Sequence, residues 1–531
     1  MTIDDLLREQ VRQRPDAIAL VDPRAAPPRR TLTYQQLEHE VSGSAAWMTS
    51  QGLQRGSAVL TFVPMSADLY IALLAMFRLG AVALFLDPSA GREHLERCCA
   101  RWQPDALLAI PKAHLLRLRS AALRRIRRHW HTGRGWLPGT RRWSTLDTGV
   151  GATSPTSLAQ PEDAALVTFT SGSTGVPKGA VRTHAFLLAQ YEALAPGIHL
   201  HSGQVDLATL PVFTLANLAA GLTTVIPEVA LRRPGAVDPA PLFRQVREHK
   251  VTRLTASPAF FEQLVAHLQR TGETLPQLEH LHTGGAPVYP PLLDAMQGLA
   301  PNAEVVAVYG STEAEPIAHV ARTEFTEQDR QAMRSGRGLL AGPPVEQVTL
   351  RILPDQWGKP RGPYVAEQLA EQSLGPNEAG EIVVAGEHVL PGYLGGLGDE
   401  ETKFRVGEQV WHRTGDAGYL DAKGRLWLLG RCAARVQDEH GEVYPFAVEC
   451  VAMSFPAVRR AAFVAHGGRR LLIIQSRASG ETALKLCEEL RTAADWAQLN
   501  DVRIVPALPV DARHNAKIDY PALRRMLEAE G

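Results

Sequence analysis

Hydrophobic positions near the start of the chain alternate between strand-like and helix-like spacing. Residues 59–63 and 81–86 are short, continuous apolar runs, which predict buried strands. Between them, residues 69–79 are mostly apolar and end at Gly80, which predicts a helix. A strand, a helix and a strand in this order are typical of the βαβ unit of a parallel sheet. The pattern therefore predicts an α/β fold.

The same stretch is apolar enough to raise the question of a membrane span. Residues 57–88 are interrupted by Pro64, Asp68 and Arg78, so we interpret them as core elements rather than as a transmembrane segment. The first residues hold no basic segment followed by an apolar core, which predicts no secretory signal. Five cysteines without ligand spacing fit a reducing compartment, so we expect a soluble, cytoplasmic protein.

Length and charge narrow the class of protein further. A chain of 531 residues predicts two or more domains. Lys plus Arg and Asp plus Glu both number 56, so the overall balance suggests no nucleic-acid partner.

One region, residues 117–143, departs from this balance, with nine arginines interleaved with Trp130, Trp136 and Trp143. It predicts either a contact surface for a protein or a membrane, or a solvated helix and loop anchored by its tryptophans. The second interpretation is favoured, because charge runs usually form solvated faces.

The densest candidate chemistry follows a predicted strand at residues 164–167. Residues 168–179 are Thr-Phe-Thr-Ser-Gly-Ser-Thr-Gly-Val-Pro-Lys-Gly. Glycines let backbone N–H groups face an anion, hydroxyls add donors, and Lys178 supplies a positive charge. A flexible linker is the alternative, but linkers rarely follow a buried strand directly. A Walker loop is disfavoured because Lys178 stands between Pro177 and Gly179. The segment therefore predicts a phosphate-binding loop.

A second candidate segment, Tyr-Gly-Ser-Thr-Glu at residues 309–313, follows a predicted strand at residues 305–308. Tyr309 offers an aromatic ring on which a flat ligand can stack, and Thr312 offers a hydroxyl that can hydrogen-bond an anionic oxygen. Glu313 offers the hard oxygen ligand that Mg²⁺ prefers beside nucleotide phosphates. Taken alone, the segment could also be a strand-end turn with a solvated glutamate.

These segments, in this order, resemble signatures of the adenylate-forming superfamily, which contains acyl-CoA ligases, luciferases and peptide-synthetase adenylation domains. The resemblance implies a large N-terminal domain, residues 1–430, with mixed sheets and flanking helices, and a small mobile α+β C-terminal lid, residues 431–531. It implies ATP and Mg²⁺ as cofactors and a small-molecule carboxylic acid as substrate. The acid would attack the α-phosphate of ATP, giving an acyl-adenylate and pyrophosphate.

The resemblance also implies roles for individual residues. Lys517 matches the catalytic lysine of the C-terminal lid, acting with Thr312 and Lys178, and Glu313 would hold the metal ion. Asp416 would accept hydrogen bonds from both ribose hydroxyls, and Arg431 would be a second ribose or phosphate contact. The remaining nucleotide-binding residues would be Thr170, Ser171, Gly172, Ser173, Thr174, Gly175, Gly284, Gly285, Ala286, Pro287, Tyr309 and Gly310.

Nearly the whole chain is similar to the branch that contains the olefin-biosynthesis β-lactone synthetases, most closely at residues 211–227, 430–436 and 509–518. Members of that branch adenylate a β-hydroxy acid, whose own hydroxyl then displaces AMP to close a four-membered ring. Departures from the acyl-CoA ligase pattern fit this second step. Thr214 stands for a histidine and Gln437 for a lysine, and the loop before Gly441 is longer by one residue.

Two other functions stay open at this point. One is a fatty acyl-CoA ligase or an acyl-AMP ligase that loads an acyl carrier protein, and CoA-dependent release of AMP would mark the first. The other is a non-catalytic adenylate-binding protein, which the presence of Lys178, Glu313, Asp416 and Lys517 disfavours. The acyl chain length and the final acyl acceptor are likewise open.

Overall fold

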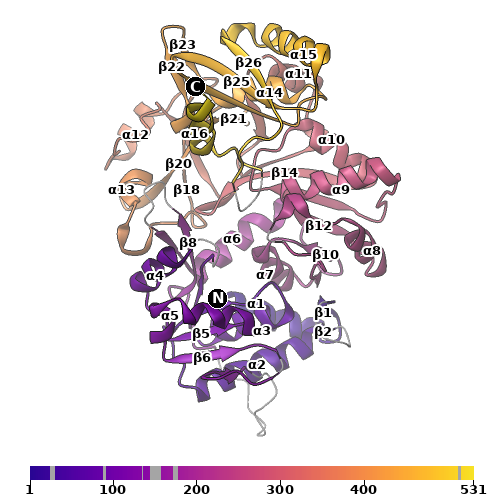
Figure 1. Ribbon diagram of the computed structural model, residues 1–531. Coiled ribbons are helices and arrows are strands. Elements are labelled where there is room, and N and C mark those ends of the chain that lie inside the picture. Colours follow the sequence, from indigo (N-terminus) through magenta and orange to yellow (C-terminus); the bar gives the residue numbers. More distant parts are fainter. Residues whose placement is uncertain are drawn as a thin grey trace. The chain divides into compact units, whose positions relative to one another are not determined.

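The computed structural model describes residues 1–23, 30–87, 91–133, 135–143, 157–171, 177–231, 233–511 and 516–530. Contacts divide the chain into two compact units (Figure 1). The first unit comprises Met1–Glu228, His249–Val251 and Leu390–Asp399, and the second comprises Val229–Glu248, Thr252–Val389 and Glu400–Gly531. Both units combine helices with sheets, which confirms the predicted α/β fold class.

The first unit holds the elements from α1 to β11. Its strands are β1 (Ile18–Asp22), β2 (Arg30–Thr33), β3 (Ala58–Phe62), β4 (Val82–Phe85), β5 (Ala106–Ala109), β6 (Arg128–His131), β7 (Arg141–Arg142), β8 (Ala164–Ser171), β9 (Pro177–Thr183), β10 (Val205–Ala208) and β11 (Thr223–Val225). Its helices are α1 (Ile3–Gln13), α2 (Tyr34–Ser50), α3 (Ala67–Arg78), α4 (Arg92–Arg101), α5 (Ala121–Arg125), α6 (His184–Gly197) and α7 (Pro211–Ala220), with a 3₁₀ segment, η2, at Pro111–Leu118.

A seven-stranded sheet forms the centre of the first unit, in the order β7-β6-β5-β3-β4-β8-β9. Its strands are parallel except for the antiparallel pair β8 and β9. The predicted strand, helix and strand are β3, α3 and β4, so the predicted βαβ unit is confirmed. Every residue of α3 except Asp68 is buried, which explains its nearly continuous apolar sequence. No helix among the described residues is long and apolar enough to cross a membrane.

The last residue of α3 joins three helices of the first unit. Arg78 is fully buried and pairs with Asp4 of α1 at 2.7 Å and with Glu38 of α2 at 2.8 Å. It also donates a hydrogen bond to Ser42 at 2.8 Å. Buried charges persist only where they are paired and hydrogen-bonded, so this network fixes α1 and α2 against α3.

The second unit holds the elements from α8 onward. Its strands are β12 (Arg253–Ala256), β13 (His280–Gly284), β14 (Glu304–Ser311), β15 (Ala314–Ala321), β16 (Leu339–Gly342), β17 (Thr349–Leu353), β18 (Gly380–Ala385), β19 (Lys403–Val406), β20 (Gln409–Leu420), β21 (Leu426–Arg431), β22 (Val436–Asp438), β23 (Gly441–Val443), β24 (Arg460–His466), β25 (Arg469–Gln475) and β26 (Asp501–Val505). Its helices are α8 (Ala240–Glu248), α9 (Pro258–Thr271), α10 (Pro290–Leu299), α11 (Glu327–Arg334), α12 (Ala366–Gln372), α14 (Pro445–Met453), α15 (Gly480–Ala493) and α16 (Tyr520–Glu530), while α13 (Asp399–Thr402) begins in the first unit.

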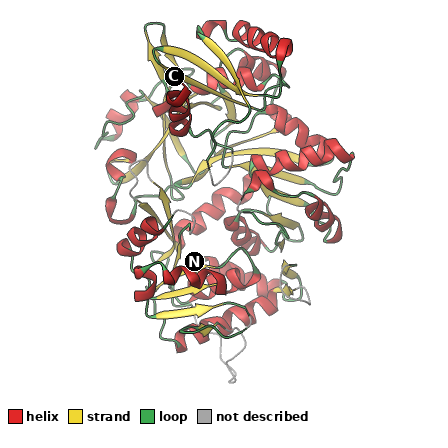
Figure 2. Cartoon of the chain, viewed as in Figure 1, coloured by secondary structure: helices red, strands yellow, loops and turns green. Residues whose placement is uncertain are grey.

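Three groups of paired strands in the second unit matter for the site. Strands β12, β13 and β14 are parallel, with β15 antiparallel to β14. A six-stranded antiparallel sheet has the order β16-β21-β20-β18-β17, with β19 beside β20. A small sheet, β24-β25-β26, packs against α14 and α15 (Figure 2). Its two hydrophobic clusters draw all their residues from position 436 onward, although the predicted domain boundary between residues 430 and 431 stays a prediction.

Candidate active site

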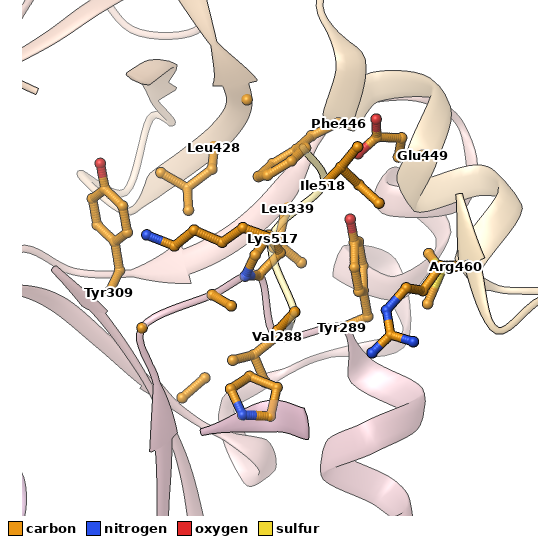
Figure 3. Close-up of a pocket in the computed structure, with 18 of the residues that line it drawn as sticks. Val288, Tyr289, Tyr309, Leu339, Leu428, Phe446, Glu449, Arg460, Lys517 and Ile518 are labelled. Atoms are coloured by element: carbon orange, nitrogen blue, oxygen red, sulfur yellow. The ribbon is translucent and has the colours of Figure 1, made fainter. Parts of the chain in front are cut away.

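A cavity of about 460 Å³ lies within the second unit (Figure 3). This volume is within the roughly 300–1,000 Å³ of small-molecule sites. Its walls come from the turn after β13, from β14, β16, β20 and β21, from α14 and from residues 516–521. Predicted site residues that line it are Gly285, Ala286, Pro287, Tyr309, Gly310, Asp416, Arg431 and Lys517. The fold therefore gathers residues that lie more than 200 positions apart in the sequence around one cavity.

One wall carries a polar group formed by Asp416, Arg431 and Tyr309. The register of β20 and β21 sets Asp416 opposite Arg431, and the Arg431 Nε lies 3.2 Å from the Asp416 Oδ1. The Tyr309 hydroxyl donates to the Asp416 Oδ2 at 2.8 Å. Burial, and next the charge of Asp416, raise the pKa of Tyr309 well above its usual value, so the phenol stays protonated. Each carboxylate oxygen has a further lone pair, which leaves acceptor capacity for a ribose hydroxyl.

The turn after β13 brings backbone close to this cavity. Gly284 ends β13, and a Cβ atom there would lie 2.6 Å from the Val308 carbonyl oxygen on β14. Gly285 follows with a φ of 82°, a conformation that only glycine adopts readily. Gly284 itself is not among the lining residues, whereas the three positions after it are. The cavity leaves this turn accessible to a ligand. Its contact with a flat adenine ring stays a prediction.

The turn between β14 and β15 holds Thr312 and Glu313 directly after the cavity wall. The Ser311 hydroxyl accepts hydrogen bonds from the backbone N–H groups of Glu313 and Ala314, both at 3.2 Å. Neither Thr312 nor Glu313 lines the cavity. Asp416 raises the pKa of Arg431 most, and Tyr309 and Glu313 act in the same direction. Glu313 is therefore electrostatically coupled to the charged wall.

Glu313 is the protein carboxylate predicted to bind a magnesium ion. Among the described residues, no group of three or more His, Cys, Asp or Glu side chains could hold a metal ion. Mg²⁺ beside nucleotides is usually bound by one or two carboxylates together with phosphate oxygens, rather than by a protein cage. Glu313 fits such a role, which stays a prediction.

Lys517 enters the cavity from the segment between β26 and α16. Figure 3 shows its side chain extending into the pocket with the ammonium end toward Tyr309. A short antiparallel bridge joins Val510 to Ile518, and the Asp511 N–H donates to the Lys517 carbonyl oxygen at 2.9 Å. The Asp511 carboxylate accepts hydrogen bonds from the N–H groups of Lys517, at 2.9 Å, and Ala516, at 3.2 Å. Asp511 therefore holds the backbone of Ala516 and Lys517 in place.

A buried acidic group stands behind this lysine and escaped the sequence analysis. Glu449 of α14 lines the cavity and accepts hydrogen bonds from the Tyr520 hydroxyl and, at 3.0 Å, from the Phe463 N–H. Burial raises the pKa of Glu449 to about 7. Tyr520 begins α16, three residues after Lys517, so Glu449 anchors the segment that carries the lysine. The available signal was one glutamate inside the apolar run of α14.

The phosphate-binding loop belongs to the first unit. Thr170 and Ser171 end β8, while Gly172, Ser173, Thr174 and Gly175 lie outside the described residues. Lys178 stands on β9 opposite Thr170, with its ammonium 5.7 Å from the centre of the Tyr393 ring. It is nearly buried, and a Cβ atom on Gly398 would collide with it. Lys178 and Lys517 therefore lie in different compact units.

Comparisons with known proteins identify the family and the fold of this chain. Residues 7–394 match the AMP-binding enzyme family. The chain is 34% identical to an olefin β-lactone synthetase of Stenotrophomonas maltophilia over 99% of its length and 97% of the relative, and 33% identical to one of Xanthomonas campestris over 96% and 94%. The crystal structure of the anthranilate CoA ligase AuaEII in complex with anthranoyl-AMP has the same fold, with a TM-score of 0.80, 18% identity and coverage of 100% and 98%. Its sequence shows that this chain belongs to the AMP-binding enzyme family.

Proposed function

We propose that this protein uses ATP to activate a β-hydroxy fatty acid as its acyl-adenylate, and that the hydroxyl of the acid then closes a β-lactone with release of AMP. The observation that carries the first step is the cavity that gathers Tyr309, Asp416, Arg431 and Lys517. The names of the two β-lactone synthetase relatives support the second step.

In the first step, a carboxylate oxygen attacks the α-phosphorus of ATP and the bond to pyrophosphate breaks. Lys517 extends into the cavity, and its charge would stabilise the negative charge that gathers on the reacting oxygens. Asp416 would hold the ribose while Tyr309 stacks on the adenine. Mg²⁺ bound by Glu313 and phosphate oxygens would neutralise further charge. The step requires alignment and charge rather than a protein nucleophile.

In the second step, the hydroxyl oxygen attacks the acyl carbon, the bond from that carbon to the AMP oxygen breaks, and the hydroxyl proton passes to solvent. Both reacting groups belong to one bound molecule, so their effective concentration exceeds that of any free thiol. A closed cavity would also protect the adenylate from hydrolysis. No CoA is consumed.

The β22–β23 hairpin supports an acceptor other than CoA. In acyl-CoA ligases this segment carries the lysine of the thioester-forming step, where this chain has Gln437. Asp438 is bound by two nitrogens of Arg470, at 2.8 and 2.6 Å. Arg470 is buried and also donates to the Gly441 carbonyl at 2.8 Å and the Ala497 carbonyl at 2.9 Å. The hairpin is therefore fixed to β25 from within, and Gln437 is exposed on it.

A second departure lies in the first unit. Thr214 is fully buried in the first half of α7, and its hydroxyl has no hydrogen-bond partner among the described residues. Acyl-CoA ligases carry a histidine here, whose larger ring has two polar nitrogens. A small buried hydroxyl cannot make the same contacts, which supports an altered second step.

The experiment supplies a racemic β-hydroxy fatty acid, ATP and Mg²⁺ with and without CoA. We expect AMP release at the same rate in both mixtures and a product lighter than the acid by one water, detected by mass spectrometry. With ¹⁸O in the carboxylate, one label should pass to AMP. The acid without the hydroxyl is the matched control and should give adenylate but no lactone.

Three results would contradict the proposal. AMP release that requires CoA, with acyl-CoA as the product, would assign a CoA ligase. AMP release only with an acyl carrier protein would assign a loading enzyme. Absence of label in AMP would reject adenylation itself.

A further inference from the structure

A strongly basic stretch of the first unit takes no part in the chemistry described above. Residues 106–146 contain ten lysines and arginines and no aspartate or glutamate, although the two charge types balance over the whole chain. The stretch covers β5, η2, α5, β6 and β7. Such a concentration of one charge sign creates a local potential that attracts anions.

The structure separates the three tryptophans of this stretch into two groups. Trp130 and Trp143 are buried, and the Trp143 indole donates to the Ser44 hydroxyl at 3.0 Å. These two anchor the stretch, as the favoured interpretation of the sequence expected. Trp136 is 84% exposed, and Leu118 and Leu115 are 76% and 60% exposed. Anchoring does not explain these three side chains.

Contacts hold the exposed apolar residues on neighbouring segments. The Arg124 Nη1 donates to the carbonyl oxygens of Arg117, at 3.0 Å, and Leu118, at 3.2 Å, which fixes α5 against the end of η2. A Cβ atom on Gly139 would lie 3.2 Å from the Arg117 Nη2, so the loop that carries Trp136 also adjoins η2. Exposed cations flank these segments; they are Lys112, Arg119, Arg124, Arg125 and Arg127.

We propose that this surface, which we call the basic–apolar patch (Lys112, Leu115, Leu118, Arg119, Arg124, Arg125, Arg127 and Trp136), docks on an anionic phospholipid membrane. Tryptophan and leucine side chains enter the interfacial region of a bilayer, while arginines pair with lipid phosphates. Each basic residue near an anionic surface adds to the attraction. Proteins that bind single-stranded nucleic acids stack the bases on aromatic side chains. Exposed leucines flanked by cations therefore fit a lipid surface better than a nucleic acid. Binding of this kind is peripheral and needs no membrane-spanning helix.

The experiment is cosedimentation of the full-length protein with vesicles of phosphatidylcholine alone or with 30% phosphatidylglycerol. We expect at least fivefold more protein to pellet with the anionic vesicles, and the difference to shrink at high salt. The triple variant Arg119→Glu, Arg125→Glu and Arg127→Glu should lose this difference. Arg124 is left unchanged because it braces η2. The variant Trp136→Ser should lower pelleting several-fold without a change in net charge.

A triple variant with the same charge change elsewhere serves as the control. Arg405→Glu, Lys423→Glu and Lys485→Glu replace exposed cations outside the patch and should pellet like the wild type. Equal pelleting with both vesicle types, or equal loss in both triple variants, would overturn the proposal. Tighter binding to single-stranded RNA or to polyglutamate than to anionic vesicles at the same salt would assign the patch to those partners instead. Unchanged thermal unfolding of each variant confirms that it folds.

Discussion

Two segments in the C-terminal part of the second unit are each held by an aspartate, and they differ in the side chain that they present. In the Lys517 segment, residues 516–518, the backbone N–H groups of Ala516 and Lys517 donate to Asp511, and the lysine extends into the cavity. In the β22–β23 hairpin, Asp438 pairs with buried Arg470, and the exposed position carries Gln437 rather than a lysine. The first segment keeps the lysine to which we assign adenylation. The hairpin is held in place by Arg470 and lacks the lysine of the thioester-forming step. We therefore assign this protein the adenylation half of the ligase reaction and a different second half.

The largest effect should come from removing the lysine of the Lys517 segment. Lys517→Ala should lower the rate of adenylate formation by about 100-fold or more, because one charged donor at a transition state is worth about 3 kcal/mol. ATP binding should change little, since the wall formed by Asp416 and Arg431 is intact. Pyrophosphate exchange measures the first quantity and calorimetry the second. Lys485→Ala, on an exposed face of α15, is the control; exchange at the wild-type rate in Lys517→Ala would remove the lysine from the mechanism.

A smaller effect should follow from removing the hydrogen bonds that hold the Lys517 segment. Asp511→Ala removes an acceptor of two backbone N–H groups and should lower kcat about tenfold, since hydrogen bonds to a charged group are worth about 1.5–3 kcal/mol. The KM for ATP should hold, because Asp511 positions the lysine rather than the nucleotide. Asp511→Asn keeps an acceptor oxygen and should recover part of the rate. Asp438→Ala is the matched change in the β22–β23 hairpin. A comparable loss of kcat in that variant would contradict our proposal that only the Lys517 segment serves adenylation.

The two regions should also respond to pH in opposite directions. Burial raises the pKa of Glu449, which anchors the Lys517 segment, from a usual 4.5 to about 7. The stability that the neutral carboxyl contributes to the fold is therefore complete below about pH 4.5 and is lost as the pH rises to about 7. Hydrogen bonds from Arg470 lower the pKa of Asp438, so its contribution is lost only as the pH falls below about 4. From pH 5 to 7.5, the unfolding temperature of the wild type should fall by several degrees relative to Glu449→Gln, and not relative to Asp438→Asn. A constant difference between wild type and Glu449→Gln would contradict the buried-acid assignment.

The smallest effect should come from restoring the ligase residue in the hairpin. Gln437→Lys changes an exposed side chain on a hairpin that Arg470 holds in place, so adenylation and lactone formation should stay within about twofold of wild type. CoA should still be unnecessary. Formation of acyl-CoA by this single variant, measured by mass spectrometry, would show that the lysine alone decides the second half of the reaction.

The sequence predicted what depends on local pattern. The βαβ unit around α3 and the strand that delivers Tyr309 follow from continuous apolar runs and are confirmed. Residues 207–213 show the limit of such patterns: their short apolar run also fits a strand and a turn, whereas α7 begins at Pro211. A short apolar run does not distinguish a buried strand from a buried helix, and here proline at the first helical position was the missed signal.

The candidate site divides in the same way. Asp416, Arg431 and Lys517 were predicted because they stand in segments with a family resemblance, and the fold gathers them around one cavity. Glu449 and Tyr520 were missed because their meeting depends on how α16 packs against α14, and no spacing along the chain encodes that contact. The roles of all these residues await the variants described above.

The buried Arg78 has a practical consequence for anyone who shortens this protein. The family match begins at residue 7, and a chain trimmed to that point would lack Asp4. Arg78 would then keep Glu38 and Ser42 but lose the partner that is as deeply buried as itself. The first turn of α1 is thus part of the packing of three helices and should be kept. Affinity tags and fusion partners should be added ahead of Met1 and should not replace this turn.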